Sequence, residues 1–142
     1  MKYIVGNWKS HKSVDEARSW FEEFGGLYKR LPEVKVVVAV PSVYVFAAKK
    51  WVGEFDLEGV GLAVQDISPF PFGAYTGAVA AEMIKGAVEY AIVGHSERRE
   101  YFNESNQDVA NKVRQLREAG VRPIVCVDMP YAKAQMAAID DE

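Results

Sequence analysis

Short apolar runs alternate with segments of helical periodicity along the whole sequence. The apolar runs are rich in valine and isoleucine and predict strands at residues 2–6, 34–40, 60–65, 90–93 and 121–127. The segments that follow them predict helices at residues 14–31, 43–52, 78–86, 105–119 and 131–139. Strict alternation of strands and helices favours one parallel sheet with right-handed crossovers.

Local signals set the expected limits of several helices. Ser13 is followed three residues later by Glu16, which is the spacing of a capping box at a helix start. Pro32 is expected to close the first helix and Gly53 the second. Gly120 is expected to end the helix at 105–119 in a left-handed conformation.

The alternating pattern leaves two architectures open, a doubly wound sheet and part of a (β/α)8 barrel. The turn after the first strand, residues 6–10, contains one glycine. A dinucleotide-binding turn would be rich in glycine, so the dinucleotide fingerprint is absent. No linker divides the chain, and we expect residues 1–142 to form one α/β unit of parallel (β/α) repeats.

Composition excludes several classes of function. The formal net charge of −3 gives no general reason to expect nucleic acid or an anionic membrane as a partner. No apolar run approaches the roughly 18 residues of a membrane span. The single cysteine, Cys126, has no partner for an intrachain disulfide; we expect it to be buried and inert, in a reducing cytoplasm. No cluster of histidines, cysteines and carboxylates has metal-ligand spacing, so no metal is expected.

Polar residues that can carry chemistry lie at the ends of three of the predicted strands. Asn7 and Lys9 follow the first strand, and His95 and Glu97 follow the fourth; Gln65 and Asp66 lie at the end of the third. The carboxyl ends of parallel strands open on one face, so these groups can converge. Lys9 supplies positive charge for an anionic substrate, and His95 can act as an acid, a base or a hydrogen-bond donor to a carbonyl oxygen.

Each of these residues also has an ordinary structural interpretation. A lysine in a turn after a strand is usually a solvated charge, and a single histidine there is more often structural. The second histidine, His11, is expected at the surface. For Arg98 and Arg99 we favour a solvated, self-paired helix start or an interface.

Four motifs together resemble the triosephosphate isomerase family. They are Gly6-Asn7-Trp8-Lys9, Gly73-Ala74-Tyr75-Thr76-Gly77, Gly94-His95-Ser96-Glu97-Arg98-Arg99 and Pro123-Ile124-Val125-Cys126-Val127. They occur in the order and spacing of the family and cover essentially all of the chain. The resemblance implies the N-terminal portion of a (β/α)8 barrel, with strands one to five, their helices and the start of a fifth helix.

The resemblance also implies an activity and roles for the residues. The family interconverts dihydroxyacetone phosphate and D-glyceraldehyde 3-phosphate through an enediolate, without a cofactor. Carried over, His95 is the electrophile, held neutral by a helix N-terminus as is known for this family. Lys9 stabilises negative charge on the substrate, Asn7 positions Lys9, and Glu97 supports Lys9 or its loop.

A further set of residues is implied at a subunit interface. Thr76 would lie at the tip of a loop that inserts into a neighbouring subunit near the Asn-Lys turn. Tyr75 and Arg98 are expected at the same interface. The resemblance thus implies a dimer of completed barrels.

Part of the family's catalytic machinery has no counterpart in the sequence. The catalytic glutamate after the sixth strand and the phosphate-binding turns after strands seven and eight are missing. Ala78, Asn103 and Asp128 also depart from the family's usual residues. We therefore hypothesise the N-terminal half of a split isomerase, active only when a complementary C-terminal half-barrel chain completes it.

This hypothesis carries a structural expectation and has competitors. The first and fifth strands should be open edges, and apolar inward-facing residues should lack an opposing wall. Those residues were expected among Val36, Val38, Leu62, Val64, Ile92 and Ile124. The alternatives are a non-catalytic half-barrel that self-associates through its open edges and a truncated fragment of a longer protein.

Overall fold

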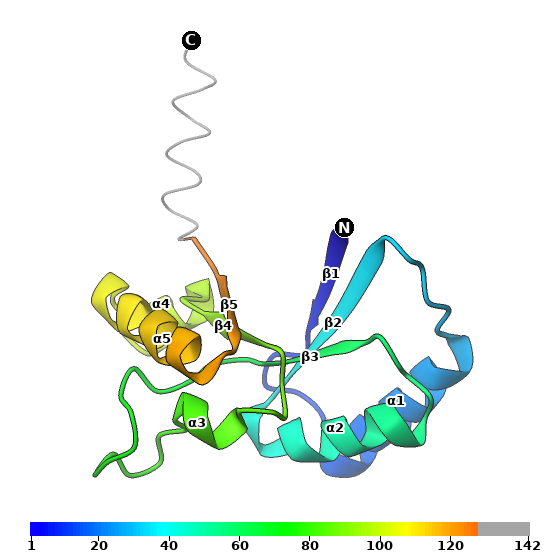
Figure 1. The fold of residues 1–142 in the computed structure, drawn as a ribbon. Coiled ribbons are helices and arrows are strands. Elements are labelled where there is room, and N and C mark those ends of the chain that lie inside the picture. The colour runs from blue at the N-terminus through cyan, green and yellow to red at the C-terminus, as the bar shows by residue number, and fades with distance from the viewer. Residues whose placement is uncertain (128–142) are drawn as a thin grey trace.

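The five strands form a single parallel sheet that curls into a half-barrel (Figure 1). The computed structural model describes residues 1–127. Neighbouring strands follow chain order, and every pairing is parallel. The strands are β1 (Lys2–Asn7), β2 (Val34–Val40), β3 (Gly61–Val64), β4 (Tyr90–Val93) and β5 (Arg122–Val125). The structure therefore confirms the predicted parallel repeats and excludes the doubly wound strand order.

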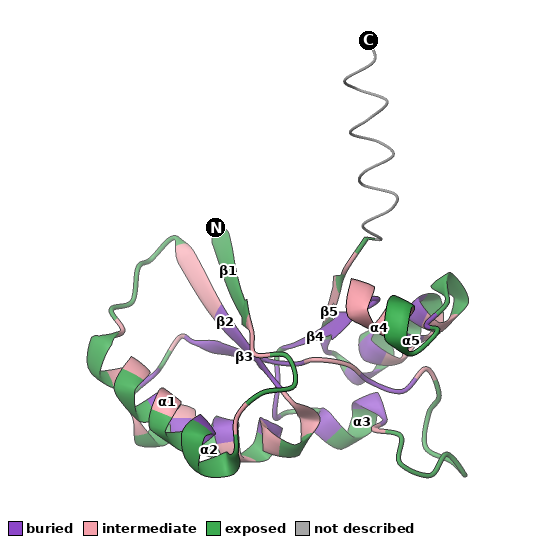
Figure 2. Ribbon diagram, turned by 180° about the vertical axis from the view of Figure 1, so that it is seen from behind, coloured by how far each residue is buried: buried purple, intermediate pink, exposed green. Residues whose placement is uncertain are grey.

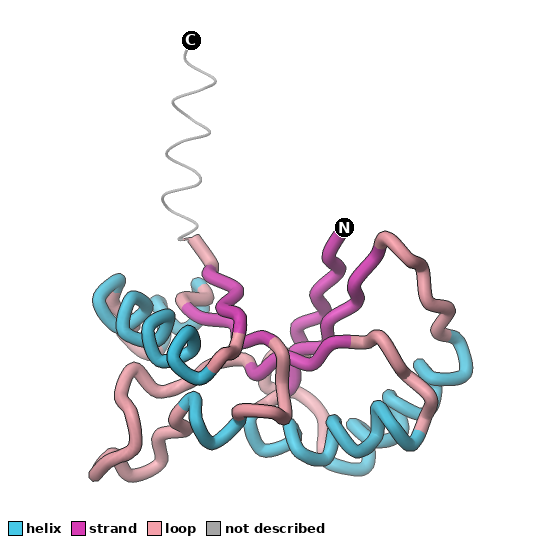
Figure 3. The backbone as a smooth tube through the Cα atoms, viewed as in Figure 1, coloured by secondary structure: helices cyan, strands magenta, loops and turns pink. Residues whose placement is uncertain are grey.

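The helices lie outside the curl and leave its inner side uncovered (Figure 3). They are α1 (Val14–Leu27), the 3-10 turn η1 (Ser42–Tyr44), α2 (Val45–Glu54), α3 (Ala81–Ile84), α4 (Ser96–Tyr101) and α5 (Asn106–Ala119). The short helix α4, which directly follows the turn at His95, was foreseen only as a helix start at Arg98 and Arg99. The helix predicted at residues 131–139 lies outside the described residues.

The capping signals are confirmed where they were clearest. Ser13 and Ser105 both form capping boxes, in which the serine accepts a backbone N–H and the third helical residue bonds back. Gly120 ends α5 with φ 75, as predicted. These contacts satisfy backbone groups that helix ends otherwise leave without partners.

The predicted limits of three helices are wrong; the helix predicted at residues 78–86 spans only Ala81–Ile84. The helix α1 ends at Leu27 rather than near Pro32, just after Gly25 and Gly26, which lower helix propensity. Gly25 allows a close approach, because a Cβ there would lie 2.7 Å from the Phe55 carbonyl oxygen at the end of α2. The helix α2 continues through Gly53 to Glu54.

The main hydrophobic core lies between the sheet and its helices. It includes Val38, Leu62 and Val64, so these three are not among the inward-facing residues, although the expected set contained them. Val36 lies on the same face, because it is two residues from Val38 on one strand. The error arose because strands buried on both faces show no alternation that distinguishes one face from the other.

A second cluster lines the inner, concave face of the sheet. It contains Val37, Ala39, Ala63, Tyr90 and Ile92, with Ile124 and Cys126 packed against it. Ile92 and Ile124 thus face inward, as predicted. Because the sheet curls, Val37 and Ala39 have no exposed surface. The inner face is therefore not the continuous exposed apolar patch that the sequence predicted.

Within the sheet, the large apolar side chains that are exposed lie on the two edge strands. Within residues 1–127, β1 pairs only with β2, and β5 only with β4. On β1, Tyr3 is 53%, Ile4 58% and Val5 39% exposed, which is visible as the exposed colour of that strand in Figure 2. On β5, Val125 is 50% exposed. The prediction of open edges at the first and fifth strands is confirmed.

Candidate functional site

The predicted site residues of the first and fourth strands converge on one cleft at the carboxyl ends of the strands. Asn7, Lys9, His95 and Glu97 all line it. The cleft extends to the loop between β3 and α3, which contributes Tyr75 and Thr76. This location is where parallel α/β folds place their chemistry.

Lys9 and Glu97 form an ion pair across the cleft. Lys9 Nζ lies 2.5 Å from Glu97 Oε1. This hydrogen bond lowers the pKa of the Glu97 carboxyl below its ordinary value. The Lys9 backbone is left-handed, with φ 57, and its N–H donates to Asn7 Oδ1 at 2.9 Å. Asn7 therefore holds the turn that directs Lys9 into the cleft.

His95 caps the N-terminus of α4 with its imidazole. Its Nδ1 accepts the Glu97 N–H at 3.2 Å. A ring nitrogen that accepts a hydrogen bond carries no proton, so the neutral imidazole carries its proton on Nε2. In its neutral form His95 is thus arranged to donate through Nε2.

A closed network of four charged side chains lies beside this turn. Arg98 Nε lies 2.9 Å from Asp66 and 2.8 Å from Glu104, and Lys112 Nζ lies 2.6 Å and 2.7 Å from the same two carboxylates. Glu104 and Lys112 are buried. Burial alone raises the pKa of Glu104, but the hydrogen bonds from Lys112 and Arg98 outweigh it and hold that pKa below its ordinary value. The network joins the end of β3 to α4 and α5.

Comparison with known proteins identifies the family. The family model described as triosephosphate isomerase matches residues 2–141. The chain belongs to the triosephosphate isomerase family. The triosephosphate isomerase of Thermus thermophilus is 45% identical over 129 residues, which cover 89% of this chain and 50% of that relative. The triosephosphate isomerase of Deinococcus radiodurans is 42% identical over 122 residues, covering 85% of this chain and 48% of that relative.

The match covers only part of the length of each relative. For the triosephosphate isomerase of Mesomycoplasma hyorhinis, identity is 39% over 130 residues, covering 87% of this chain and 51% of the relative. This chain spans about half the length of the curated relatives that it matches. Family membership and the N-terminal part of the barrel are therefore established for these residues.

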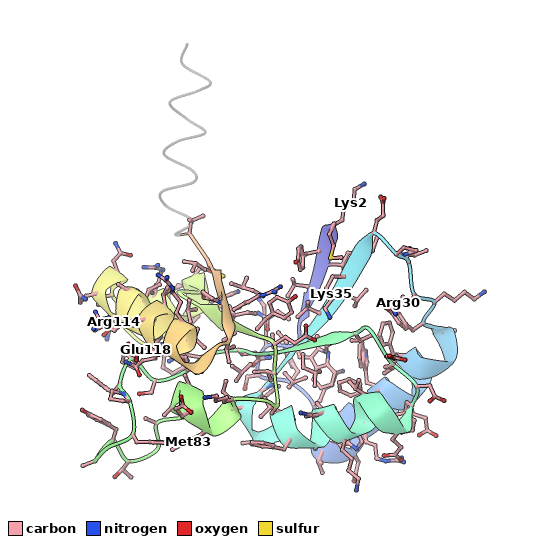
Figure 4. All side chains as sticks on the ribbon, viewed as in Figure 1. Lys2, Arg30, Lys35, Met83, Arg114 and Glu118 are labelled. Atoms are coloured by element: carbon pink, nitrogen blue, oxygen red, sulfur yellow. The ribbon has the colours of Figure 1, made fainter. Side chains whose placement is uncertain are left out.

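Sequence reasoning missed two members of the charged network, Glu104 and Lys112. One signal was present, because Lys112 lies on the same helical face as Val109 and Leu116, the buried stripe of α5. A lysine in an apolar stripe needs a buried partner. Arg114 and Glu118 on the same helix are exposed instead (Figure 4).

Arg98 lies at a helix start, in α4, as predicted, but it is not self-paired within that segment. Its guanidinium is bound by Asp66 and Glu104, which lie on other segments of the chain. That Arg98 lies at a subunit interface stays a prediction. Tyr75 and Thr76 lie exposed on the loop between β3 and α3, where Tyr75 stacks on Phe70 at 4.4 Å.

The remaining sequence expectations concern Cys126, His11, metals and membranes. Cys126 is half-buried rather than buried, and burial raises the pKa of its thiol. His11 is exposed, as expected. Within residues 1–127, no three histidine, cysteine or carboxylate side chains are grouped to hold a metal ion. The helices of this same region are too short or too polar to cross a membrane.

Proposed function

We propose that this chain supplies the electrophilic side of a triosephosphate isomerase site, formed by His95, Lys9 and Asn7 with Glu97 as the support of Lys9. The observation that carries the proposal is the convergence of Lys9 and His95, from strands β1 and β4, on one cleft. The relatives that the chain matches are named triosephosphate isomerases. The substrates are then dihydroxyacetone phosphate and D-glyceraldehyde 3-phosphate.

The geometry supports separate roles in the reaction for a base, for His95 and for Lys9. A base removes the proton beside the carbonyl, and the electron pair of that C–H bond moves to give an enediolate. His95 Nε2–H donates to the carbonyl oxygen as negative charge develops there. The Lys9 ammonium stabilises the same charge and the phosphate ester of the substrate. The hydroxyl proton on the deprotonated carbon moves to the former carbonyl oxygen, and the abstracted proton returns to the former carbonyl carbon, which gives the isomer.

The base is the part that the described cleft does not offer. Within residues 1–127, the carboxylates that line the cleft are Asp66 and Glu97. Burial raises the pKa of the Asp66 carboxyl, but both of its oxygens are ion-paired, Oδ2 to Arg98 and Oδ1 to Lys112. Glu97 is ion-paired to Lys9, and its lowered pKa makes it a weak base. We propose that a glutamate outside this chain is the base.

We further propose that a complementary C-terminal half-barrel brings this base and the phosphate-binding turns. The open edges of β1 and β5 are where its strands would pair. Completed barrels would then dimerise through the loop that contains Tyr75 and Thr76, with Arg98 at the interface. Such an assembly would act in the cytoplasm.

A second candidate is a non-catalytic half-barrel, or fragment, that self-associates. The exposed apolar side chains of β1, led by Ile4 at 58%, favour it. In that assembly each copy would keep its own His95 cleft, with no added glutamate.

Reconstitution separates the two candidates. The chain is mixed with the C-terminal half of the Thermus thermophilus relative, and complex formation is followed by analytical ultracentrifugation. A one-to-one complex that isomerises D-glyceraldehyde 3-phosphate supports the proposal. Self-association without such a complex supports the second candidate. His95→Asn should abolish most turnover while the complex persists, and unchanged turnover would remove His95 from the mechanism.

A further inference from the structure

Two charged side chains hold the backbone of Gly94, the residue before His95. The Gly94 N–H donates to Glu104 Oε1 at 3.0 Å, and the Gly94 carbonyl accepts from Arg99 Nε at 2.8 Å. The sheet ladder ends one residue earlier, where the Cys126 N–H donates to the Val93 carbonyl at 2.9 Å. Side chains rather than the sheet therefore hold the backbone at Gly94, while the His95 carbonyl accepts the N–H groups of Arg98 and Arg99.

Gly94 turns the chain sharply from β4 into α4. Its φ is 71, a left-handed value that favours glycine. A Cβ at this position would lie 2.9 Å from Arg99 Nη2 and 3.0 Å from Val109 Cγ2. The turn is thus tightly enclosed, and a small shift of Gly94 would move the imidazole of the next residue.

Glu104 joins the residue before His95 to the helix after it. One carboxylate oxygen binds Gly94, while the other binds Arg98 of α4 at 2.8 Å and Lys112 at 2.7 Å. The carboxylate has to accept hydrogen bonds on both sides. A glutamine amide has the same shape but accepts on one side only. Its NH2 group would therefore face another donor, either the Gly94 N–H or the two cations.

We propose that Glu104 and Arg99 are positioning residues for His95. By fixing the Gly94 peptide, they keep the imidazole where Nδ1 accepts the Glu97 N–H and the ring proton stays on Nε2. This inference rests on the proposed role of His95 as the electrophile and explains how that tautomer is maintained. Through Glu104, the buried network of charged side chains then positions His95 as well as stabilising the fold.

The test is nuclear magnetic resonance of the chain labelled with ¹⁵N-histidine. The chain has two histidines, so the exposed His11 serves as an internal reference. With both rings neutral, His95 should show one protonated and one unprotonated nitrogen, whereas His11 should average over both tautomers. Glu104→Gln should shift His95 toward the averaged pattern.

Asp66→Asn is the matched control. It removes the same charge from the same two cations, but Asp66 does not contact Gly94. The His95 tautomer should persist in Asp66→Asn. An unchanged tautomer in Glu104→Gln, or equal loss in both variants, would show that the network is structural only.

A second pair of variants applies if circular dichroism shows that Glu104→Gln does not fold. Arg99→Met removes the donor to the Gly94 carbonyl from a less buried position. Asn106→Ala, its control, removes the other partner of Arg99, which lies at 2.7 Å. Tautomer averaging in the first and not in the second supports the inference; unchanged His95 signals in Arg99→Met overturn it.

Activity provides a separate readout. In the completed complex, the variant that shifts the tautomer should lower kcat by about 10- to 100-fold with KM nearly unchanged, as misplaced catalytic groups do. An inactive wild-type complex would overturn the proposed function, whereas the tautomer measurement on the chain alone would still decide the role of Glu104 and Arg99.

Discussion

Lys9 Nζ and Glu97 Oε1 lie 2.5 Å apart, although the two residues are 88 positions apart in the sequence. The contact joins the turn after β1 to the first turn of α4. Lys9 has a left-handed backbone conformation, which costs a residue with a side chain about 1–2 kcal/mol. A strained, charged residue held by a distant carboxylate at a strand end is typical of a binding site.

Loss of the Lys9 charge should weaken phosphate binding. In the completed complex, Lys9→Met should raise the dissociation constant of glycerol 3-phosphate about 10- to 100-fold, the range for a lost hydrogen bond to a charged group. Isothermal titration calorimetry measures it. Lys12→Met is the control, because Lys12 lies over the Trp8 ring and does not line the cleft. Equal weakening by both substitutions would reduce Lys9 to a general surface charge.

Acid should destabilise the chain partly through Glu104. Its pKa in the folded state is lower than its ordinary value of 4.5. Its contribution to the free energy of unfolding is therefore present above about pH 4.5 and lost as pH falls through the lower, folded value. Urea unfolding between about pH 6 and pH 3 should show a smaller loss for Glu104→Gln than for the wild type.

The control for that pH series is Glu118→Gln on the exposed surface of α5. It should follow the wild-type pH dependence closely. If Glu104→Gln also keeps the full wild-type slope, the assigned direction of the Glu104 pKa is wrong.

The caps of the two long helices should differ in strength. The Asp108 N–H donates to Ser105 Oγ at 3.1 Å, whereas the Glu16 N–H lies 3.4 Å from Ser13 Oγ. Ser105→Ala should lower the free energy of unfolding by about 1 kcal/mol, and Ser13→Ala by less. Urea denaturation measures both, and Ser105→Asp should restore most of the loss. A larger effect at Ser13 would contradict this ranking.

The open edge of β1 should promote association of the isolated chain. Ile4→Lys places a charge on that edge and should shift sedimentation toward the monomer. Because Ile4 is exposed, the free energy of unfolding should change by no more than about 0.5 kcal/mol. Val43→Lys, also exposed but in the 3-10 turn, should leave association unchanged. Equal effects would indicate a general response to charge.

Strand positions and the main site residues were predictable because their signals are local. Strand β4 has the predicted limits, Tyr90–Val93, since an apolar run ending at glycine marks them. Lys9 and His95 were found because the carboxyl ends of parallel strands share one face. The inner and outer faces of β2 and β3 were not predictable, because their valines and leucines are buried on both sides.

Ion pairs between residues far apart in the chain were the other feature that could not be predicted from the sequence. The charge-rich segment after His95 was interpreted as self-paired and solvated, yet Glu97 pairs with Lys9 and Arg98 with Asp66. Each partner lies more than thirty residues away in the chain. Such pairs follow from how the strands are ordered in the sheet, so they became visible only with the fold.

The rate of isomerisation of D-glyceraldehyde 3-phosphate, measured with and without the completing half-barrel, tests the central claim most directly. The account predicts no measurable turnover by this chain alone and turnover by the one-to-one complex that His95→Asn removes. Turnover by the isolated chain at the level of the complex would contradict the proposal that the catalytic base lies outside it.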